Sequence, residues 1–392
     1  MLRQYLHSAA ATRPFRVLAL ETSADDTCAA IVDSSRRIWS NVVVNQHYLH
    51  EGYGGIQPLV AMHAHQRNIP TVVRQALTDA NLQMADIDGV AFTRGPGPLT
   101  TLFFTAFSLV PGLPGCLSIG LNAAKTLAAA TCKPLVGVHH MQAHALTAHL
   151  TTDPAPEFPF LTLLVSGGHT MIVLATSMHE FRIIANTVDR SIGSTIDRCA
   201  TLLQIKWPQD LGPGPGLERF CAEDVPDEAG APHFQAPTIM RGQLAFSFTA
   251  LHSWVERTIN AAGGTEHVPR RALARAFQNA AFAELETKLL LALKWCETHH
   301  HAVRHLVVSG GVASNTLLRQ RLKTCVSRTR FMEMKLVFPD PSFCTDNAAM
   351  IAWASMHRFL AQDHDQFTIA PLPKWSIEAI RNPPTSTMNL FP

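Results

Sequence analysis

The strongest constraint on the fold is a unit of strand, polar turn and strand that occurs twice in the chain. Apolar runs at 16–20 and 28–32 flank one polar turn, and apolar runs at 160–165 and 171–175 flank a glycine-rich one. Each unit is followed by a third strand-like run and then by alternating helical and strand patterns, which is typical of α/β proteins. We therefore predict an α/β fold with two related lobes that face each other across a cleft.

Hydrophobic periodicity assigns the remaining elements. We place residues 15–136 in an N-terminal lobe and 137–356 in a C-terminal lobe, and we expect 357–392 to return to the first lobe. Residues 206–245 are rich in glycine and proline and resemble an irregular insertion. The other predicted strands are 38–44, 90–93, 135–138, 181–185, 306–308 and 335–338. The predicted helices are 58–80, 119–131, 192–203, 248–260, 271–298, 314–326 and 346–360.

Composition excludes several classes of protein. Only 16% of the 392 residues are charged and the formal net charge is +2, so any contact with nucleic acid must use a local basic patch. The 8 cysteines include no C-x-x-C pair, which excludes a zinc ribbon or a thioredoxin motif. No uncharged apolar run reaches the roughly 20 residues of a membrane-spanning helix.

Two segments stand apart from the predicted lobes. Residues 1–14 contain arginine, alanine and hydroxylated residues but no acidic residue, as in a mitochondrial transit peptide. An ordinary ragged terminus is the alternative. Pro98–Gly112 lies between two Gly-Pro turns, and its deletion would leave a continuous turn. We interpret it as an insertion, with translated intron sequence as one origin.

The string VHHMQAH contains a candidate pair of metal ligands. On a helix, His140 and His144 would lie one turn apart on the same face, so both imidazoles can bind one metal ion. The string lacks the glutamate of H-E-x-x-H metalloproteases. Asp346 can supply an oxygen ligand. The alternatives are a pair of hydrogen-bonded histidines, and a Thr345 and Asp346 that only stabilise the start of the next helix.

Three polar turns are candidates for the predicted cleft. In LVSGGHT, glycines let the backbone of 164–168 approach an anion, with a plain hairpin turn as the alternative. In ETSADDT, three carboxylates, including Asp25 and Asp26, need a cation, hydrogen bonds or solvent. In VSGGVASN, a cap at Ser314 would place a helix N-terminus there, and Asn315 offers a donor and an acceptor to a nucleotide.

Taken together and in this order, the motifs resemble the tRNA N6-adenosine threonylcarbamoyltransferase family, formerly labelled O-sialoglycoprotein endopeptidases. The matching strings run from Leu20 to about Trp353 and are LETSADDT, TRGPG, VHHMQAH, LLVSGGHT, AFSFTALHS, VSGGVASN and FCTDNAAMIAW. The resemblance implies an actin-like, sugar-kinase-like architecture with duplicated ribonuclease-H-like lobes. It also implies one divalent metal ion per subunit, iron or zinc, bound by His140, His144 and Asp346. The implied substrate contacts are Leu164, Val165, Ser166, Gly167, Gly168, Asp197, Gly214 and Asn315.

The implied reaction moves a threonylcarbamoyl group from threonylcarbamoyl-AMP to N6 of the adenosine beside the anticodon, in tRNAs that read codons beginning with A. We expect a separate synthase to supply the acyl-adenylate, and the chain to form a homodimer in the mitochondrial matrix. Asp25 or Asp26 would assist proton removal or orient the acyl group. Arg74, Arg271 and Arg358 are candidates for the basic patch that tRNA requires.

Some positions depart from the family pattern. Ala24 stands where cysteine is common, Ser194 where a glutamate or aspartate is usual, and His252 where a lysine is usual. The position matched to Gly214 lies in GPGPGLERF, where the alignment can shift by a few residues. A catalytically weak scaffold of a tRNA-modification complex and a small-metabolite kinase of the same fold are alternative functions. A metallo-endopeptidase would lack its general-base glutamate.

Overall fold

The chain is built around two mixed β-sheets. The computed structural model describes residues 13–50, 53, 56–97, 113–207, 212–225 and 232–384. Residues 1–12 of the predicted leader and the predicted insertion, Pro98–Gly112, lie outside these ranges. None of the helices within the described ranges is long and apolar enough to cross a membrane.

The first sheet has the strand order β3-β2-β1-β4-β5. β1 pairs with β2 and β2 with β3 in antiparallel fashion, whereas β4 and β5 join β1 in parallel. The apolar residues of β1 are fully buried because helices cover both faces of this sheet. The bounds are β1 (Arg16–Glu21), β2 (Asp26–Asp33), β3 (Ile38–Asn45), β4 (Gly89–Gly95) and β5 (Leu135–His139).

The second sheet repeats this topology in the order β11-β10-β6-β7-β8-β9. β6, β7 and β8 are antiparallel, β10 and β11 join β6 in parallel, and β9 extends the other edge. The repetition confirms the predicted α/β fold with related halves. The bounds are β6 (Phe160–Val165), β7 (Thr170–Ala175), β8 (Phe181–Thr187), β9 (Ala245–Phe246), β10 (His305–Ser309) and β11 (Lys335–Val337).

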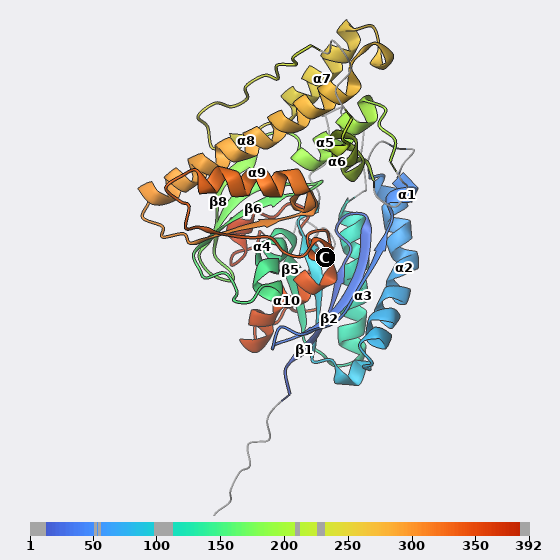
Figure 1. Ribbon diagram of the computed structural model, residues 1–392. Helices are drawn as coiled ribbons and strands as arrows, with labels where there is room; N and C mark the ends of the chain where they lie inside the picture. The colour runs from blue at the N-terminus through green and yellow to red at the C-terminus, as the bar shows by residue number, and fades with distance from the viewer. Residues whose placement is uncertain are drawn as a thin grey trace, which may run out of the picture.

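Helices cover the outer faces of both sheets and also fill the space between them (Figure 1). α2 and α3 pack on the first sheet, and α5, α7, α8 and α9 pack on the outer face of the second. α4 and α10 lie between the sheets. The bounds are α1 (His47–His50), α2 (Pro58–Asp79), α3 (Leu113–Ala130), α4 (His140–Thr151), α5 (Ile192–Leu202), α6 (Pro213–Ala222), α7 (Thr249–Ala261), α8 (Arg270–Thr298), α9 (Thr316–Ser327) and α10 (Ala348–Leu360).

The two central helices give both sheets a common core. One buried cluster combines Val17 of β1, Leu146 of α4, Val173 of β7 and Met350 of α10. Because this cluster takes side chains from both halves of the chain, α4 and α10 are packed on both sides. Residues on these two helices are therefore held in fixed positions relative to both sheets.

One predicted irregular segment contains a helix. Within 206–245, α6 begins at Pro213, directly after Gly212, whose φ is +74°. Proline is favoured at the first position of a helix because its fixed φ suits the helix and its missing N–H is not needed there. The description of this segment as wholly irregular was wrong, because the Gly-Pro repeat marks a helix start as well as a turn.

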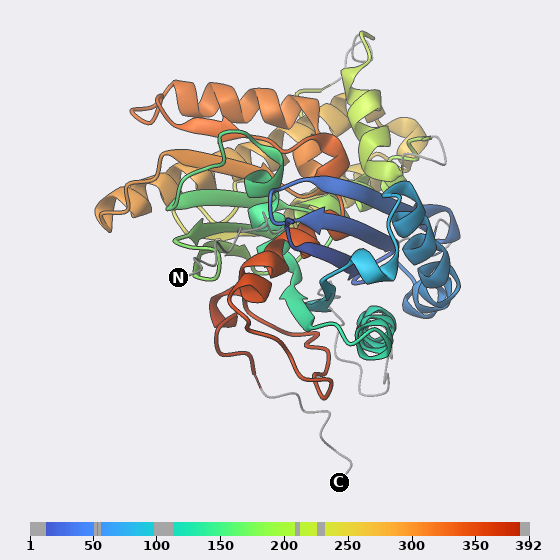
Figure 2. The same ribbon diagram turned by 90° about the horizontal axis from the view of Figure 1, so that it is seen from below.

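After α10 the chain runs back along the first sheet (Figure 2). The N–H of Asp365 donates to the carbonyl oxygen of Leu135 at 2.8 Å, and the N–H of Leu372 donates to that of Arg94 at 2.8 Å. We call residues 365–379 the C-terminal strap.

Candidate active site

Two histidines of α4 and one aspartate before α10 converge where the central helices meet. Nε2 of His144 lies 3.0 Å from Oδ1 of Asp346, and Nε2 of His140 lies 3.5 Å from the same oxygen. One ligand atom from each residue lies within 4.8 Å of the others, and both histidines are buried. The structure therefore brings all three predicted metal ligands together.

Asp346 is free to face the histidines because its neighbour caps the helix. Oδ1 of Asn347 accepts a hydrogen bond from the N–H of Met350 at 3.0 Å, so α10 begins at Ala348. Asparagine is among the preferred N-cap residues. The alternative in which Thr345 caps this helix and Asp346 occupies its first turn is wrong.

Glu21, the last residue of β1, contacts the first metal ligand from the opposite side. Its fully buried carboxylate places Oε2 3.1 Å from Nδ1 of His140, and the same oxygen accepts a hydrogen bond from the hydroxyl of Thr93. Since a carboxylate only accepts, Nδ1 carries the proton and Nε2 is left as the ligand atom. Sequence reasoning counted this carboxylate in the ETSADDT turn but assigned it no role, although a glutamate that ends an apolar strand indicates a buried polar partner.

The charges of this cluster favour a cation. Burial alone would raise the pKa of Asp346, but His140 and His144 hold it below its usual value. Burial lowers the pKa of His140, but Asp346 and Glu21 outweigh it and raise that pKa to about 9. The positive charge of protonated His140 thus balances two carboxylates. A divalent ion can replace the proton on Nε2 of this imidazole. Two imidazole nitrogens and one carboxylate oxygen suit zinc or ferrous iron.

The glycine-rich turn after β6 lies next to this cluster. The ring of His169 has its centroid 6.3 Å from that of His140. Burial, then His140 and His144, lower the pKa of His169 to about 3, so this ring is neutral. Oγ of Ser166 accepts hydrogen bonds from the N–H groups of Gly168 at 3.3 Å and of His169 at 3.0 Å, which fixes the turn.

The predicted substrate contacts in this turn are backbone contacts. The side chains of Leu164 and Val165 are buried in the core, so only their main chain can reach a substrate. A Cβ on Gly167 would meet nothing within 4 Å, which leaves that side of the turn open. Oγ of Ser191, the N-cap of α5, donates to the carbonyl oxygen of Gly167 at 2.5 Å and joins the helix to the turn.

Asp197 and Gly214 also come together, α5 lying against α6. A Cβ on Gly214 would lie 3.3 Å from Oδ1 of Asp197. Burial is the main reason that the pKa of Asp197 is raised to about 7. His47 lowers this pKa and Asp25 raises it, both by smaller amounts. His47 and Asp25 follow the strands of the first sheet, so Asp197 of the second half interacts electrostatically with residues of the first.

The side chain of Asn315 has a structural role at the start of α9. Its Oδ1 accepts a hydrogen bond from the N–H of Leu318 at 3.0 Å and caps α9, so the predicted cap at Ser314 was wrong. Because the cap uses the amide oxygen, a nucleotide would be contacted through Nδ2. Gly310 has a φ of +101°, and a Cβ there would lie 2.3 Å from the carbonyl oxygen of Val165. The third turn is therefore packed directly against β6.

The two aspartates of the first turn have different surroundings. Oδ2 of Asp25 lies 3.1 Å from Nδ1 of His47, and this hydrogen bond raises the pKa of His47 to about 9. Oδ1 of Asp26 accepts a hydrogen bond from Asn45 at 2.8 Å. Burial, then Asp25 and Asp346, raise the pKa of Asp26 well above its usual value. The surroundings therefore favour the protonated form of Asp26, whereas Asp25 pairs with His47.

A fully buried histidine of α2 fixes the backbone of this turn. Nε2 of His65 lies 3.0 Å from the carbonyl oxygen of Ala24, and its Nδ1 lies 2.8 Å from the hydroxyl of Thr27 and 3.2 Å from Nε2 of Gln46. Since a carbonyl only accepts, Nε2 carries the proton and Nδ1 accepts. Burial lowers the pKa of His65, in agreement with a neutral ring. Nothing in the local sequence marks this residue.

Two of the three arginines proposed for tRNA contact are engaged within the fold. Arg358 pairs with Asp363 at 2.7 Å and with Asp365 at 2.9 Å, and Arg271 pairs with Glu223 at 2.7 Å. Arg74 is exposed on α2. The ion pairs give Arg358 and Arg271 a structural reason to be present.

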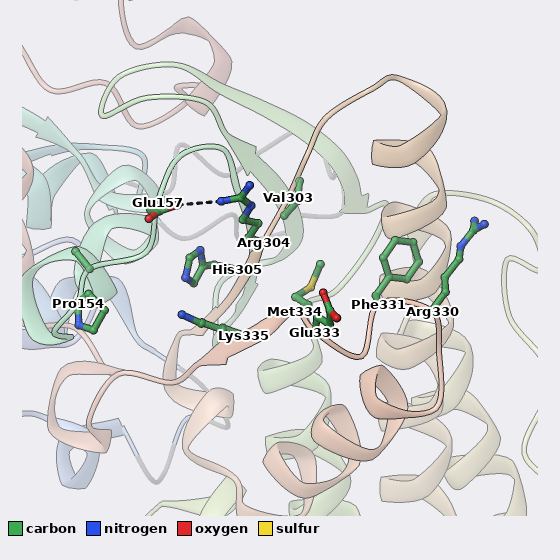
Figure 3. Close-up of a pocket in the computed structure, with 11 residues that line it drawn as sticks. Pro154, Glu157, Val303, Arg304, His305, Arg330, Phe331, Glu333, Met334 and Lys335 are labelled. Atoms are coloured by element: carbon green, nitrogen blue, oxygen red, sulfur yellow. Dashed lines mark ion pairs between the residues drawn. The ribbon is translucent and has the colours of Figure 1, made fainter.

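A separate surface pocket of about 380 Å³ lies at the other end of β10 and β11 (Figure 3). His305 and Lys335 begin these strands and line it, as do Glu157 and Arg304, which pair at 3.7 Å. None of the predicted site residues lines this pocket, so we do not assign it to the reaction.

Comparison with known sequences identifies the family. The family model described as tRNA N6-adenosine threonylcarbamoyltransferase matches residues 37–106 and 104–353. The two matched parts meet inside the predicted insertion, Pro98–Gly112. The mitochondrial tRNA N6-adenosine threonylcarbamoyltransferase of Schizosaccharomyces pombe (strain 972) is 36% identical over 383 residues, which cover 94% of this chain and 88% of that protein.

Solved structures agree on the fold. HypF of T. kodakarensis aligns with a TM-score of 0.56 and 12% identity, over 89% of this chain and 48% of that one. Component A of the Acidaminococcus fermentans (R)-2-hydroxyglutaryl-CoA dehydratase aligns with a TM-score of 0.51 and 11% identity, over 88% of this chain and 98% of that one. Identities this low show the fold alone, which is the actin-like, sugar-kinase-like architecture. With the family match, the resemblance seen in the motifs is confirmed, and the chain belongs to the tRNA N6-adenosine threonylcarbamoyltransferases, a family of acyltransferases.

Proposed function

We propose that this chain transfers the threonylcarbamoyl group from threonylcarbamoyl-AMP to N6 of the adenosine at position 37, beside the anticodon, in mitochondrial tRNAs that read codons beginning with A. The observation that carries the proposal is the convergence of His140, His144 and Asp346 next to the turn at 166–169. The proposed metal centre and the turn proposed to bind the adenylate thus lie side by side.

In this reaction the exocyclic amine attacks the acyl carbonyl carbon, and the bond from that carbon to the AMP oxygen breaks. Negative charge develops on the carbonyl oxygen and on the leaving phosphate. His140, His144 and Asp346 would hold the metal ion, which would supply Lewis-acid stabilisation of such charge. The turn at 166–168 would orient the adenylate through its backbone, since Gly167 leaves that side open.

The amine must also lose a proton, and Asp25 is our candidate acceptor. Its carboxylate pairs with His47, whereas burial and the neighbouring carboxylates raise the pKa of Asp26 and favour its protonated form. The amine proton passes to Asp25, the new C–N bond forms, and AMP leaves as the phosphate anion. Asp26 would instead donate a hydrogen bond to the acyl group.

The remaining predicted contacts are assigned to the adenylate. Leu164 to Gly168 would bind through the backbone, and Asn315 would bind through Nδ2. Asp197 and Gly214 lie together and would bind as a unit. A separate synthase would provide the acyl-adenylate.

We infer that the protein acts in the mitochondrial matrix after removal of a leader at 1–14. The acid-free composition of that segment and the mitochondrial designation of the Schizosaccharomyces pombe relative support this location. Fusion of residues 1–14 to a reporter tests the leader, because a reporter that stays in the cytosol would contradict it.

We also infer a homodimer. Val43, Tyr48, Tyr53 and Leu59 lie close in sequence on the outside of the first half and are 40%, 58%, 62% and 44% exposed. Large exposed apolar side chains that gather in one region mark interaction surfaces. Sedimentation of the wild type and of Tyr48→Glu tests this, since a monomeric wild type would contradict it.

The proposed activity is tested with purified protein, unmodified mitochondrial tRNA and threonylcarbamoyl-AMP. Nucleoside mass spectrometry should show threonylcarbamoyladenosine with the wild type and strongly reduced product with Asp346→Asn. Glu286→Gln is the matched control, because Glu286 is half-buried and pairs with Arg321 on α9, away from the cluster. If the wild type alone gave no product, the scaffold function would be favoured. The same would hold if product formed only after partner proteins were added. Phosphate transfer from labelled ATP to small acceptors would favour the kinase.

A further inference from the structure

The C-terminal strap contacts the residue immediately before the first metal ligand. Nε2 of His139 lies 3.1 Å from the carbonyl oxygen of Trp375, and the two rings are in contact with centroids 4.7 Å apart. His139 is 1% exposed and Trp375 is 8% exposed. The contact joins residues 236 positions apart in the sequence.

His139 is also the N-cap of α4, the helix that carries both histidine ligands. Its Nδ1 accepts a hydrogen bond from the N–H of Gln142 at 3.4 Å. Because the carbonyl of Trp375 only accepts, Nε2 must carry the proton, which leaves Nδ1 free to accept at the cap. Histidine is not among the usual cap residues. The ring must therefore be held in one orientation for both hydrogen bonds to form.

Trp375 is fixed on its other side. Its Nε1 donates a hydrogen bond to the carbonyl oxygen of Ala379 at 3.1 Å. Next to this turn, Oε1 of Glu378 accepts a hydrogen bond from the N–H of Ile183 in β8 at 2.9 Å. The strap thus leaves the first sheet, crosses the start of α4 and ends on the second sheet.

The TRGPG motif explains how the strap reaches this position. The N–H of Gly97 donates to the carbonyl oxygen of Pro373 at 3.3 Å. Gly95 has a φ of +151°, and a Cβ there would lie 1.9 Å from the carbonyl oxygen of Leu372. Only glycine allows this approach. A motif that supplies no metal ligand therefore acts by seating the strap.

We propose that Trp375 is a positioning residue for the metal centre. By orienting the His139 ring, it fixes the first turn of α4 and so the direction of Nε2 of His140. The inference rests on the proposed metal site. It predicts that a loosened strap weakens metal binding while the two sheets stay folded.

The test uses full-length proteins freed of metal and titrated with Zn²⁺. Trp375→Ala should weaken Zn²⁺ binding about tenfold, as loss of outer-shell support does in other metal sites. Trp375→Phe keeps a ring against His139 and should bind nearly as the wild type does. Trp295→Ala is the matched control, because Trp295 stacks on His299 with centroids 4.0 Å apart at the end of α8, away from α4. A folded Trp375→Ala protein with wild-type Zn²⁺ affinity would overturn the proposal.

His139→Asn provides a second route if Trp375→Ala does not fold. Asparagine is a strong cap but is too short to reach Trp375, so it removes the link and keeps the cap. We expect weaker Zn²⁺ binding with unchanged circular dichroism, and unchanged affinity would count against the strap.

Amide exchange in the metal-free proteins separates this inference from the proposed function. Without the ring of Trp375 against His139, the N–H of Gln142 should exchange faster in Trp375→Ala than in the wild type. If the wild type bound no Zn²⁺, the proposed metal site would be wrong, and the exchange result alone would decide the role of the strap. Equal exchange at Gln142 would refute that role.

Discussion

Oε2 of Glu21 lies 3.1 Å from Nδ1 of His140, and this contact joins the end of β1 to the first turn of α4. A carboxylate in this position fixes the tautomer and the ring orientation of a metal-binding histidine. The first sheet therefore contacts a cluster whose proposed ligands come from α4 and from the segment directly before α10.

Glu21→Gln should lower Zn²⁺ affinity about 10- to 100-fold, because the amide keeps the size of the side chain but removes its charge. A competition titration against a chelating dye measures this. Glu286→Gln is the control, since Glu286 pairs with Arg321 at 2.7 Å away from the centre. Equal affinities for wild type and Glu21→Gln would show that the contact has no influence on the ion.

The two aspartates of the first turn should respond differently to the same change. Asp25→Asn should lower kcat by about 100-fold or more, as expected for loss of a proton acceptor. Asp26→Asn should leave kcat nearly unchanged, because asparagine resembles the protonated acid and can still accept the hydrogen bond from Asn45. Single-turnover assays with excess enzyme make the comparison. A larger loss in Asp26→Asn would reverse the assignment.

Two glycines near the substrate turn separate binding from folding. Gly167→Ala should keep the wild-type Tm, since its Cβ would meet nothing within 4 Å, and should raise KM for the acyl-adenylate. Gly193→Ala would place a Cβ 2.6 Å from the carbonyl oxygen of Ser166 and should destabilise the protein by about 1–3 kcal/mol. Thermal melts and steady-state kinetics test both. An unchanged KM in Gly167→Ala would mean that substrate does not lie on this side of the turn.

Asp197 predicts a specific dependence of stability on pH. Burial raises its pKa to about 7, so the folded state favours the protonated acid while the unfolded chain ionises near pH 4. The unfolded state therefore binds fewer protons in this window, and stability falls as the pH rises from about 4 to about 7. Asp197→Asn removes this effect and should be more stable than the wild type at pH 8, by on the order of 2–4 kcal/mol.

The gain in the free energy of unfolding from Asp197→Asn should be smaller at pH 5. At that pH the carboxyl of Asp197 is largely protonated in the folded wild type, and its protonation costs little free energy. Denaturant titrations at pH 5 and pH 8 give the comparison. If the gain were the same at both values, the carboxylate would not be the titrating group. Such a cost to stability is common at functional sites, in agreement with the proposed role of Asp197 in binding the substrate.

The sheets and the cluster of His140, His144 and Asp346 were predictable because short patterns encode them. β1 and β2 are apolar runs on either side of a polar turn, and His140 and His144 repeat at the period of a helix. Asp346 could be chosen as the third ligand, but not its exact place, because Asn347 competes for the cap. Helix boundaries depend on such single-residue choices.

The supporting contacts were not predictable, because they join distant parts of the chain. Glu21 and His140 are 119 positions apart, and His139 and Trp375 are 236 apart. In the sequence, His65 is one histidine of an ordinary amphipathic helix. Only the fold brings its ring against the carbonyl oxygen of Ala24. No local pattern indicates which of the chain's 20 histidines will be enclosed in this way.

The two central helices are also the places where the chain passes between the sheets. α4 leads from β5 into the second sheet, and α10 leads from that sheet back to the first. An ion bound by His144 and Asp346 would link these two connections between the sheets. It would thereby close a loop of 202 residues that contains the whole second sheet. Ion occupancy would then restrict the chain between the two halves and so contribute to holding the second sheet against the first.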